Sequence, residues 1–147
     1  VDLGTVRCRP EVPMLIRIAL PQDVEAILLH DPWITRETAC RKANDKQLFA
    51  AIEDGRLTGW LRYGLFWDNT PFLNMLYVLE EYRGKGIVTR LIEYWENEMK
   101  KLGYHLLLTS TAQPEFAQHF YVKLGYQAVG GFLLAPEPYE MILAKQL

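Results

Sequence analysis

The clearest hydrophobic pattern in the chain lies between residues 86 and 102. Apolar side chains recur there at the spacing that lines one face of a helix: Ile87, Leu91, Ile92, Trp95 and Met99. Gly103 follows this stripe and is a favourable helix stop. The apolar stretches on either side, residues 72–79 and 105–111, predict buried strands. Strand, helix and strand together predict a right-handed crossover with parallel strands.

The same periodicities divide the rest of the chain into short elements. Further strands are expected at residues 14–20, 46–54, 57–67, 127–134 and 139–147. Further helices are expected at residues 21–29, 36–43 and 114–125. Pro21 suits a first helical turn, Thr35 suits an N-cap, and Gly55 suits a hairpin turn. The order predicts one α/β (α+β) domain over residues 14–147, preceded by an N-terminal tail, residues 1–13.

Composition and charge narrow the classes of function. The 147 residues are 50% hydrophobic and 23% charged, as in an ordinary globular domain. The 16 basic and 18 acidic side chains leave a net charge of −2, which argues against a nucleic-acid binder with a broad basic face. The apolar runs are too short to cross a bilayer, and no secretory signal opens the chain. We therefore expect a cytoplasmic protein without nucleic-acid or membrane partners.

The few cysteines and histidines argue against disulfides and metal sites. Cys8 and Cys40 are too few for a disulfide framework, so we expect reduced thiols. The three histidines share no metal-ligand spacing: His30, His105 and His119. We therefore expect no metal site.

The junction before the longest helix, "EEYRGKGIVTRL" at residues 80–91, is unusual because it joins an apolar strand to a helix through glycines and cations. Gly84 and Gly86 permit a tight turn and a close approach to a ligand. The first N–H groups of the helix lack intrahelical partners and lie at the positive end of its dipole. Arg83 and Lys85 add charge, so the junction suits a phosphate. The alternative is an ordinary strand-to-helix turn with solvated cations.

This junction resembles the acyl-CoA-binding motif of the GNAT superfamily of N-acyltransferases. The family signature, Gln/Arg-x-x-Gly-x-Gly/Ala, falls on residues 83–88, with Val88 where Gly or Ala is usual. About thirty residues later, "AQHFYVKLGY" resembles the second family motif, in which a tyrosine precedes "x-Lys-Leu-Gly-Phe/Tyr". The resemblance covers the chain from Met14 to Leu147. It departs again at Pro114, where the family often has Asn and where Gln113 is the nearest substitute.

The resemblance implies a GNAT fold and transfer of an acetyl group from acetyl-CoA to a primary amine. The fold would be a mixed, mostly antiparallel sheet of about six or seven strands, splayed between strands 4 and 5 and flanked by about four helices. Pantetheine would lie in the splayed slot, and the diphosphate would lie on the junction amides. The residues implied in cofactor binding are Leu76, Tyr77, Val78, Arg83, Gly84, Lys85, Gly86, Ile87, Val88, Thr89, Gln113 and Phe120.

The resemblance also assigns roles in the reaction. Tyr121 would protonate the CoA sulfur; the alternative is a core aromatic residue, since its helix also carries Phe120. Glu80 or Glu81 would be the general base, and the alternative for both is a solvated turn carboxylate. Asn74 could instead hold a water that relays the proton.

The acceptor amine would be selected by the first two helices and the last hairpin. Trp33 beside Asp31 would offer a ring face and a charge; a Trp packed between the two helices is the alternative. Glu137 and Glu140 could attract an amine, or be plain surface charges. The acceptor would be a small molecule or a peptide, and the family also allows a homodimer. A non-catalytic, CoA-binding regulatory domain of the same fold is the alternative function.

Overall fold

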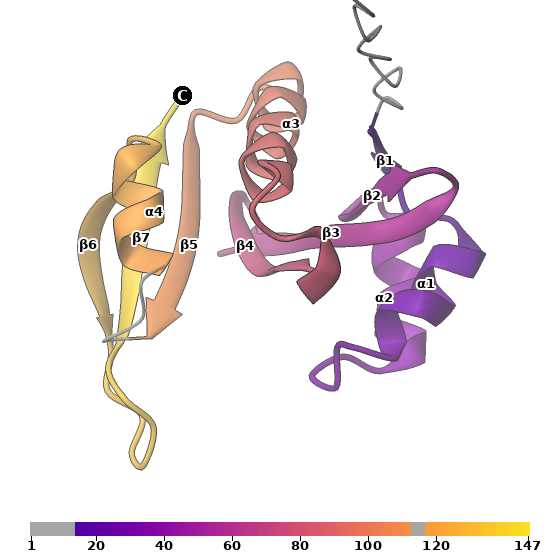
Figure 1. Ribbon diagram of the computed structural model, residues 1–147. Coiled ribbons are helices and arrows are strands. Elements are labelled where there is room, and N and C mark those ends of the chain that lie inside the picture. Colours follow the sequence, from indigo (N-terminus) through magenta and orange to yellow (C-terminus); the bar gives the residue numbers. More distant parts are fainter. Residues whose placement is uncertain (1–13, 113–116) are drawn as a thin grey trace, which may run out of the picture.

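A mixed β-sheet is the centre of the fold (Figure 1). A computed structural model describes residues 14–112 and 117–147; the predicted tail, Gln113 and Pro114 lie outside the described residues. Seven described strands form the sheet, in the order β1 (Leu15–Ile18), β2 (Leu48–Glu53), β3 (Arg56–Phe66), β4 (Thr70–Val78), β5 (Leu106–Ala112), β7 (Glu140–Gln146) and β6 (Gln127–Phe132). All neighbours run antiparallel except β4 and β5, so the predicted mixed, mostly antiparallel sheet is confirmed.

Helices cover both faces of this sheet. The described helices are α1 (Pro21–Leu28), α2 (Arg36–Asn44), the short 3-10 helix η1 (Glu80–Tyr82), α3 (Ile87–Lys101) and α4 (Ala117–Lys123). Apolar side chains of α1 and α2 pack with β2 and β3 in one core cluster. Those of α3 and α4 pack with β3, β5 and β7 in a larger cluster on the other face. The predicted element order is therefore confirmed.

The helix boundaries follow local capping rules. Thr35 caps α2, because the Thr38 amide donates to its Oγ1 at 3.2 Å. Pro21 is the first residue of α1, and Asp23 in the same turn accepts from the Leu20 amide at 2.7 Å. Helix α3 begins directly after Gly86, as its apolar stripe predicts. All five residues of that stripe are buried: Ile87, Leu91, Ile92, Trp95 and Met99.

Two local features differ from the sequence prediction. The stretch before α3 contains η1, which no pattern predicted. Strand β4 was expected to be buried on both faces, but its residues from Asn74 to Tyr77 are exposed or only half-buried. That expectation is wrong because an apolar run does not show where a face of the strand borders a cavity, as β4 does at Leu76.

Strand β4 in fact separates from β5 soon after the two meet. Their parallel ladder consists of two residue pairs, Phe72 with Leu108 and Leu73 with Thr109. Figure 1 shows the two strands diverging, with β5, β7, β6 and α4 on one side of the gap and the rest of the sheet on the other. The predicted splay between strands 4 and 5 is present.

A β-bulge lies where this separation begins. Tyr63 of β3 pairs with Leu73, but its neighbour Arg62 pairs with Met75, so Asn74 is an extra residue in β4. A bulge bends a strand and increases its twist. Asn74 therefore marks the point at which β4 turns away from β5.

The bulge also sets which face each later side chain of β4 occupies. Leu76 and Val78 pack in the cluster that contains α3, while Met75 and Tyr77 pack in the cluster that contains α1 and α2. The two faces of the splayed strand therefore present different side chains to the two sides of the sheet.

A buried ion pair connects the segment after α1 to β3. Arg62 Nε lies 2.9 Å from Asp31 Oδ2, and neither side chain is more than 11% exposed. The Trp33 amide donates to the other carboxylate oxygen of Asp31 at 3.3 Å. Removing one partner of such a pair leaves a buried charge uncompensated, which is strongly destabilising.

We expect Asp31→Asn to lower the free energy of unfolding by about 3–5 kcal/mol, because it leaves the Arg62 guanidinium buried without its counter-charge. Urea denaturation followed by circular dichroism measures this. Arg36→Gln is the matched control: its partner is Glu25, both side chains are more than half exposed, and a loss below about 1 kcal/mol is expected. Equal losses in both variants would contradict the importance of the buried pair.

Candidate functional site

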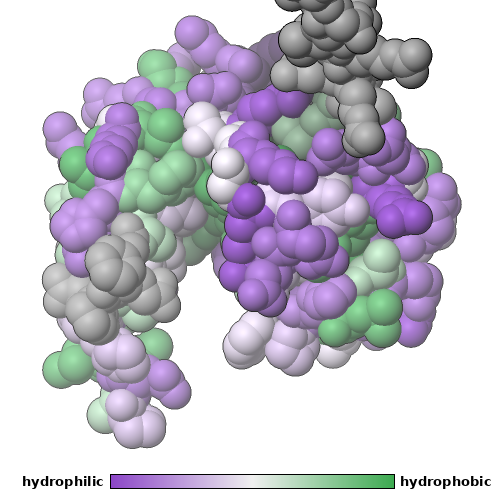
Figure 2. All heavy atoms as spheres, viewed as in Figure 1, coloured by the Kyte–Doolittle hydropathy of each residue, from purple (hydrophilic) through white to green (hydrophobic). Residues whose placement is uncertain are grey.

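A cavity of about 460 Å³ opens between the diverging strands, where α3 begins. Figure 2 shows the hollow as a deep cleft between the part with α4 and the part with η1. Ten of the predicted site residues line the cavity: Leu76, Val78, Arg83, Gly84, Gly86, Ile87, Val88, Thr89, Phe120 and Tyr121. The structure therefore brings together residues of β4, the glycine junction and α4 that are far apart in the sequence.

The backbone of the junction is shaped for a close ligand. Gly84 and Gly86 have φ of +76° and +79°, a region that side chains with a Cβ rarely adopt. No other atom of the described residues lies within 4 Å of the place where a Cβ would stand at either glycine. Gly86 is the N-cap of α3, and a glycine has no side chain of its own with which to cap the first turn. The first amides of α3 have no partner within the helix, and they lie at the positive end of a 15-residue helix.

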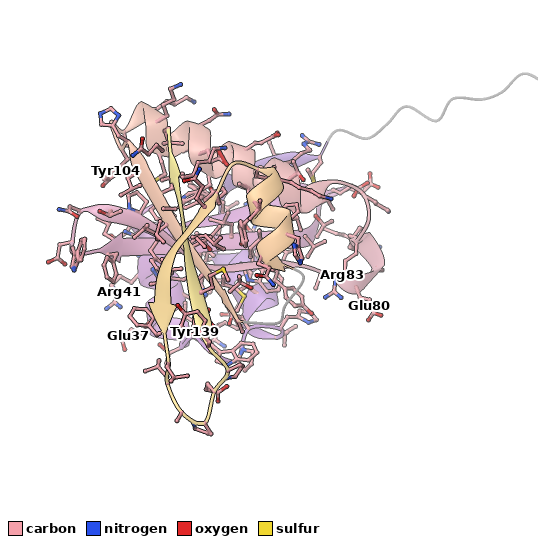
Figure 3. All side chains as sticks on the ribbon, turned by 90° about the vertical axis from the view of Figure 1, so that its left-hand side faces the viewer. Glu37, Arg41, Glu80, Arg83, Tyr104 and Tyr139 are labelled. Atoms are coloured by element: carbon pink, nitrogen blue, oxygen red, sulfur yellow. The ribbon has the colours of Figure 1, made fainter. Side chains whose placement is uncertain are left out.

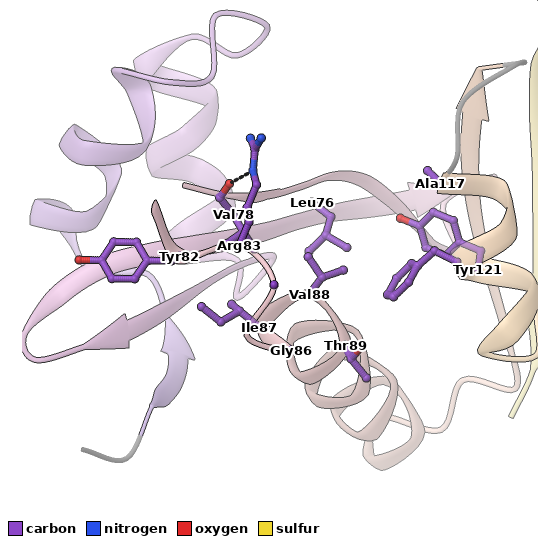
Figure 4. A pocket seen from close by; sticks show the side chains of 12 residues that line it. Leu76, Val78, Tyr82, Arg83, Gly86, Ile87, Val88, Thr89, Ala117 and Tyr121 are labelled. Carbon is purple, nitrogen blue, oxygen red and sulfur yellow. Dashed lines mark hydrogen bonds between the residues drawn. The ribbon is translucent and has the colours of Figure 1, made fainter. Parts of the chain in front are cut away.

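Two cations flank these amides, and each is held by a neighbouring ring. Arg83 Nε donates to the Val78 carbonyl at 3.0 Å, and its guanidinium lies 5.3 Å from the Tyr77 ring centre (Figure 4). Lys85 Nζ lies 5.4 Å from the ring centre of Tyr82. Lys85 directly precedes the N-cap of α3 and Arg83 lines the cavity, so the junction suits an anion such as a diphosphate.

Tyr121 lies at the opposite wall of the cavity. It is 6% exposed, and Figure 4 shows its hydroxyl turned across the cavity toward β4. Edge-to-face contacts with Phe120 and Tyr126 hold the ring, at centroid distances of 5.7 and 5.4 Å. The residue is therefore a packed aromatic and also a hydroxyl that faces the cavity.

The wall that carries Tyr121 is tied to α3 by a polar network. Glu96 of α3 accepts hydrogen bonds from Lys145 of β7 at 2.7 Å and from the Tyr126 hydroxyl at 3.3 Å. Burial, followed by the charge of Glu96, raises the pKa of Tyr126, so its proton stays on the hydroxyl. This network spans the two sides of the slot.

The other predicted cofactor residues lie around the cavity without lining it. Lys85 is exposed beside it. The side chain of Tyr77 packs on the other face of the sheet, near Trp60. The edge of β4 at Leu76, Tyr77 and Val78 has no strand partner in β5 among the described pairs. Backbone groups at these three positions could therefore bond an extended ligand in the slot.

The candidates for the general base are exposed side chains. Glu80 and Glu81 are exposed on η1, and Figure 3 shows Glu80 on the same side of the molecule as Arg83. Asn74 is exposed at the bulge, where the slot begins. Among the predicted acceptor residues, Trp33 is 76% exposed and Glu137 is exposed, whereas Asp31 is 1% exposed and paired with Arg62. Asp31 therefore has no free charge for an amine.

Two lining residues were missed by sequence reasoning. Tyr82 of η1 and Ala117 of α4 both contribute to the cavity wall. Tyr82 lies inside the junction segment itself, so an aromatic residue next to the motif was an available signal. For Ala117, no sequence signal distinguishes it from other alanines.

Comparison with known proteins identifies the family. Residues 12–126 match the model of the Acetyltransferase (GNAT) family. The chain belongs to this GNAT family. A search of curated proteins gives no match.

Solved structures of several other proteins share this fold. Ard1 from Thermoplasma volcanium superposes with a TM-score of 0.79 at 13% identity, over 91% of this chain and 97% of that chain. The ribosomal-protein-S18-alanine N-acetyltransferase from Escherichia coli gives 0.74 at 17% identity, over 91% and 94%. The paiA N-acetyltransferase from Thermoplasma acidophilum, in complex with coenzyme A, gives 0.70 at 18%, over 92% and 99%. At these identities the likeness shows the fold alone.

Two further searches of the described residues concern metals and membranes. No group of three or more His, Cys, Asp or Glu side chains in residues 14–112 and 117–147 could hold a metal ion. The helices in those ranges all fall short of the length and apolar character that a membrane crossing requires.

Proposed function

We propose that the protein is an N-acetyltransferase that moves an acetyl group from acetyl-CoA to a primary amine by direct attack in a ternary complex. The observation that carries this proposal is one cavity that joins the start of α3 to Tyr121, along the edge of β4 that β5 leaves unpaired. In this proposal the diphosphate lies at the start of α3, the extended arm lies along β4 and the proton donor is Tyr121. The open space above Gly84 and Gly86 fits a bulky anion.

Each part of the cavity has a role in binding. The amides that follow Gly84 and Gly86 hold the diphosphate, and Arg83 and Lys85 add attraction. The backbone of β4 at 76–78 bonds the pantetheine arm, as a strand partner would. Val88, in place of the usual small residue, is half-buried in the cavity wall and leaves its own amide available. Acetyl-CoA, when bound, supplies the activated acyl group.

The residues of the slot then donate and accept protons and stabilise the charge that develops during the reaction. The amine nitrogen bonds to the acyl carbon, the carbon–sulfur bond breaks, and the Tyr121 hydroxyl gives its proton to the departing thiolate. Backbone N–H groups of β4 beyond the bulge stabilise the developing oxyanion. The amine loses its proton to a water held at Asn74; Glu80 and Glu81 are the carboxylate candidates for the same step.

A non-catalytic CoA-binding domain is the second candidate, and the branched side chain of Val88 beside the diphosphate site favours it. Thiol release from acetyl-CoA, measured against a panel of amines, separates the two functions. Release that depends on the amine supports the enzyme. Tight CoA binding without thiol release from any amine supports the regulatory domain.

We expect Gly86→Glu to weaken acetyl-CoA binding by about 100-fold or more, because a carboxylate would stand where the diphosphate lies. Isothermal titration of acetyl-CoA measures this. The substitution also strains the backbone, since φ at Gly86 is +79°. Gly103→Glu is the matched control: Gly103 has φ of +89° and the same open space, but it lies at the far end of α3. Equal affinity in both variants would refute the diphosphate assignment.

We expect Tyr121→Phe to lower kcat by about 100-fold, because the thiolate would leave without a positioned acid, while the affinity for CoA stays within about twofold. Steady-state thiol release and CoA titration measure the two quantities. Tyr82→Phe is the control, since Tyr82 lines the same cavity next to the junction and should keep full turnover. A Tyr121→Phe enzyme as fast as the parent would assign the proton to another group.

A further inference from the structure

A second cavity, of about 310 Å³, lies on the other face of the sheet, and its chemistry points to the acceptor. It is lined by Gly64, Leu65, Phe66, Phe72, Asn74 and Phe132. Along β3, Gly64 is two residues from Arg62, whose side chain reaches Asp31 in the segment between α1 and α2. Because side chains alternate along a strand, Gly64 and Phe66 face that same side. The cavity that holds Tyr121 opens on the α3 side, so the two cavities lie on opposite faces.

The walls of the second cavity are apolar and aromatic. The rings of Phe66 and Phe72 lie 6.1 Å apart, and Phe132 approaches from β6. Phe132 is 43% exposed, so its apolar surface is open to a ligand. Such walls favour a ligand with an apolar or aromatic body.

The floor of this cavity is polar and is shaped around a glycine in mid-strand. A Cβ at Gly64 would stand 3.2 Å from the Asn74 side-chain amide and 3.3 Å from Lys42 Nζ. Lys42 reaches this point from α2, and its Nζ donates to the Tyr63 carbonyl at 2.6 Å. Glycine inside a strand often marks the close approach of a ligand. Here its missing side chain leaves two polar groups converging on one small space.

The charge at this floor is positive and not neutralised by a salt bridge. Arg62 is paired with Asp31, but no carboxylate of the described residues lies within 4.0 Å of Lys42 Nζ. Burial, and then the charges of Arg62 and Arg41, lowers the pKa of Lys42. An anionic group bound beside Lys42 would stabilise the charged form of Lys42 against burial and against the repulsion by the two arginines.

A carboxylate lies on the same face of the sheet as Phe132. Glu140 of β7 pairs directly with Phe132 of β6, and directly paired residues share a face of the sheet. Figure 3 shows Glu37 and Arg41 of α2 on the side of the molecule away from Glu80 and Arg83. The face of the sheet that carries the second cavity therefore holds both a cation near Gly64, Lys42, and a carboxylate paired with Phe132, Glu140.

We propose that the acceptor is an apolar or aromatic amino acid, whose carboxylate binds Lys42 and Asn74 and whose side chain lies between Phe66, Phe72 and Phe132. This inference rests on the proposed acetyltransferase function and names its substrate class. Asn74 lines this cavity and is also the bulge residue where β4 leaves β5. Leu76, two residues further along β4, lines the first cavity, so the proposed carboxylate site and that cavity are adjacent along the strand.

The test compares three amines that differ at one group: L-phenylalanine, L-phenylalaninamide and phenethylamine. We expect kcat/KM for phenylalanine, from thiol release, to exceed that of the other two by about tenfold or more, as a charged hydrogen bond implies. Lys42→Met should remove this preference by lowering kcat/KM for phenylalanine about tenfold, with the phenethylamine value within about twofold. Lys42→Arg should restore part of the preference.

Two further variants control the experiment. Lys46→Met removes the same charge from an exposed neighbouring position and should leave the preference unchanged. Gly64→Ala puts a methyl group between Lys42 and Asn74 and should lower kcat/KM for phenylalanine more than for phenethylamine. Thermal unfolding of each variant checks that its fold is intact.

The outcomes separate this inference from the proposed function. Equal rates for phenylalanine and phenylalaninamide, or a preference that survives Lys42→Met, would overturn the carboxylate site while turnover still supports the enzyme. If acetyl-CoA binds and no amine releases thiol, the enzyme itself is refuted. Saturation-transfer NMR with phenylacetate, which has no amine, then tests whether the second cavity binds a carboxylate. Binding to the parent protein that is lost in Lys42→Met supports the anion site. If phenylacetate does not bind the parent protein, the anion site is overturned.

Discussion

The architecture of the site depends on one constraint, the early end of the hydrogen-bonded ladder between β4 and β5. After two residue pairs, the bulge at Asn74 turns β4 away, and its edge is left without a strand partner. An unpaired strand edge inside a sheet is costly unless something bonds its N–H and C=O groups. The fold therefore leaves a slot along β4, and residues of β4 line both the cavity of about 460 Å³ and the cavity of about 310 Å³.

Packing and charge keep the two walls of this slot in place. On the α3 side, buried residues of α3, β5 and β7 share one core cluster. Glu96 adds polar contacts to Lys145 and Tyr126, so α3 is tied to the far wall. A ligand that enters meets a preformed cavity and orders few groups on binding, which favours affinity. The position of Tyr121 follows from the same packing, since Tyr126 holds its ring.

The two faces of β4 separate two kinds of recognition. On the α3 side the charges are backbone amides and exposed cations, which suit a mobile, multiply charged phosphate chain. On the α1 and α2 side the cation is the half-buried Lys42, within reach of a glycine gap and aromatic walls. A buried single charge discriminates more strongly between ligands than an exposed cluster does, because its solvation is already lost. The proposed cofactor site and the proposed acceptor site thus lie on opposite faces of β4.

The sequence by itself determined what local rules control. The stripe of α3, the Thr35 cap and the positive-φ glycines 84 and 86 follow from helix periodicity, side-chain capping and backbone sterics, which act within a few residues. Tertiary structure decided the rest, because it depends on strand pairing between distant segments. The bulge at Asn74, the burial of Asp31 against a strand and the meeting of Lys42 with Gly64 all arise from register and packing, which no local pattern encodes.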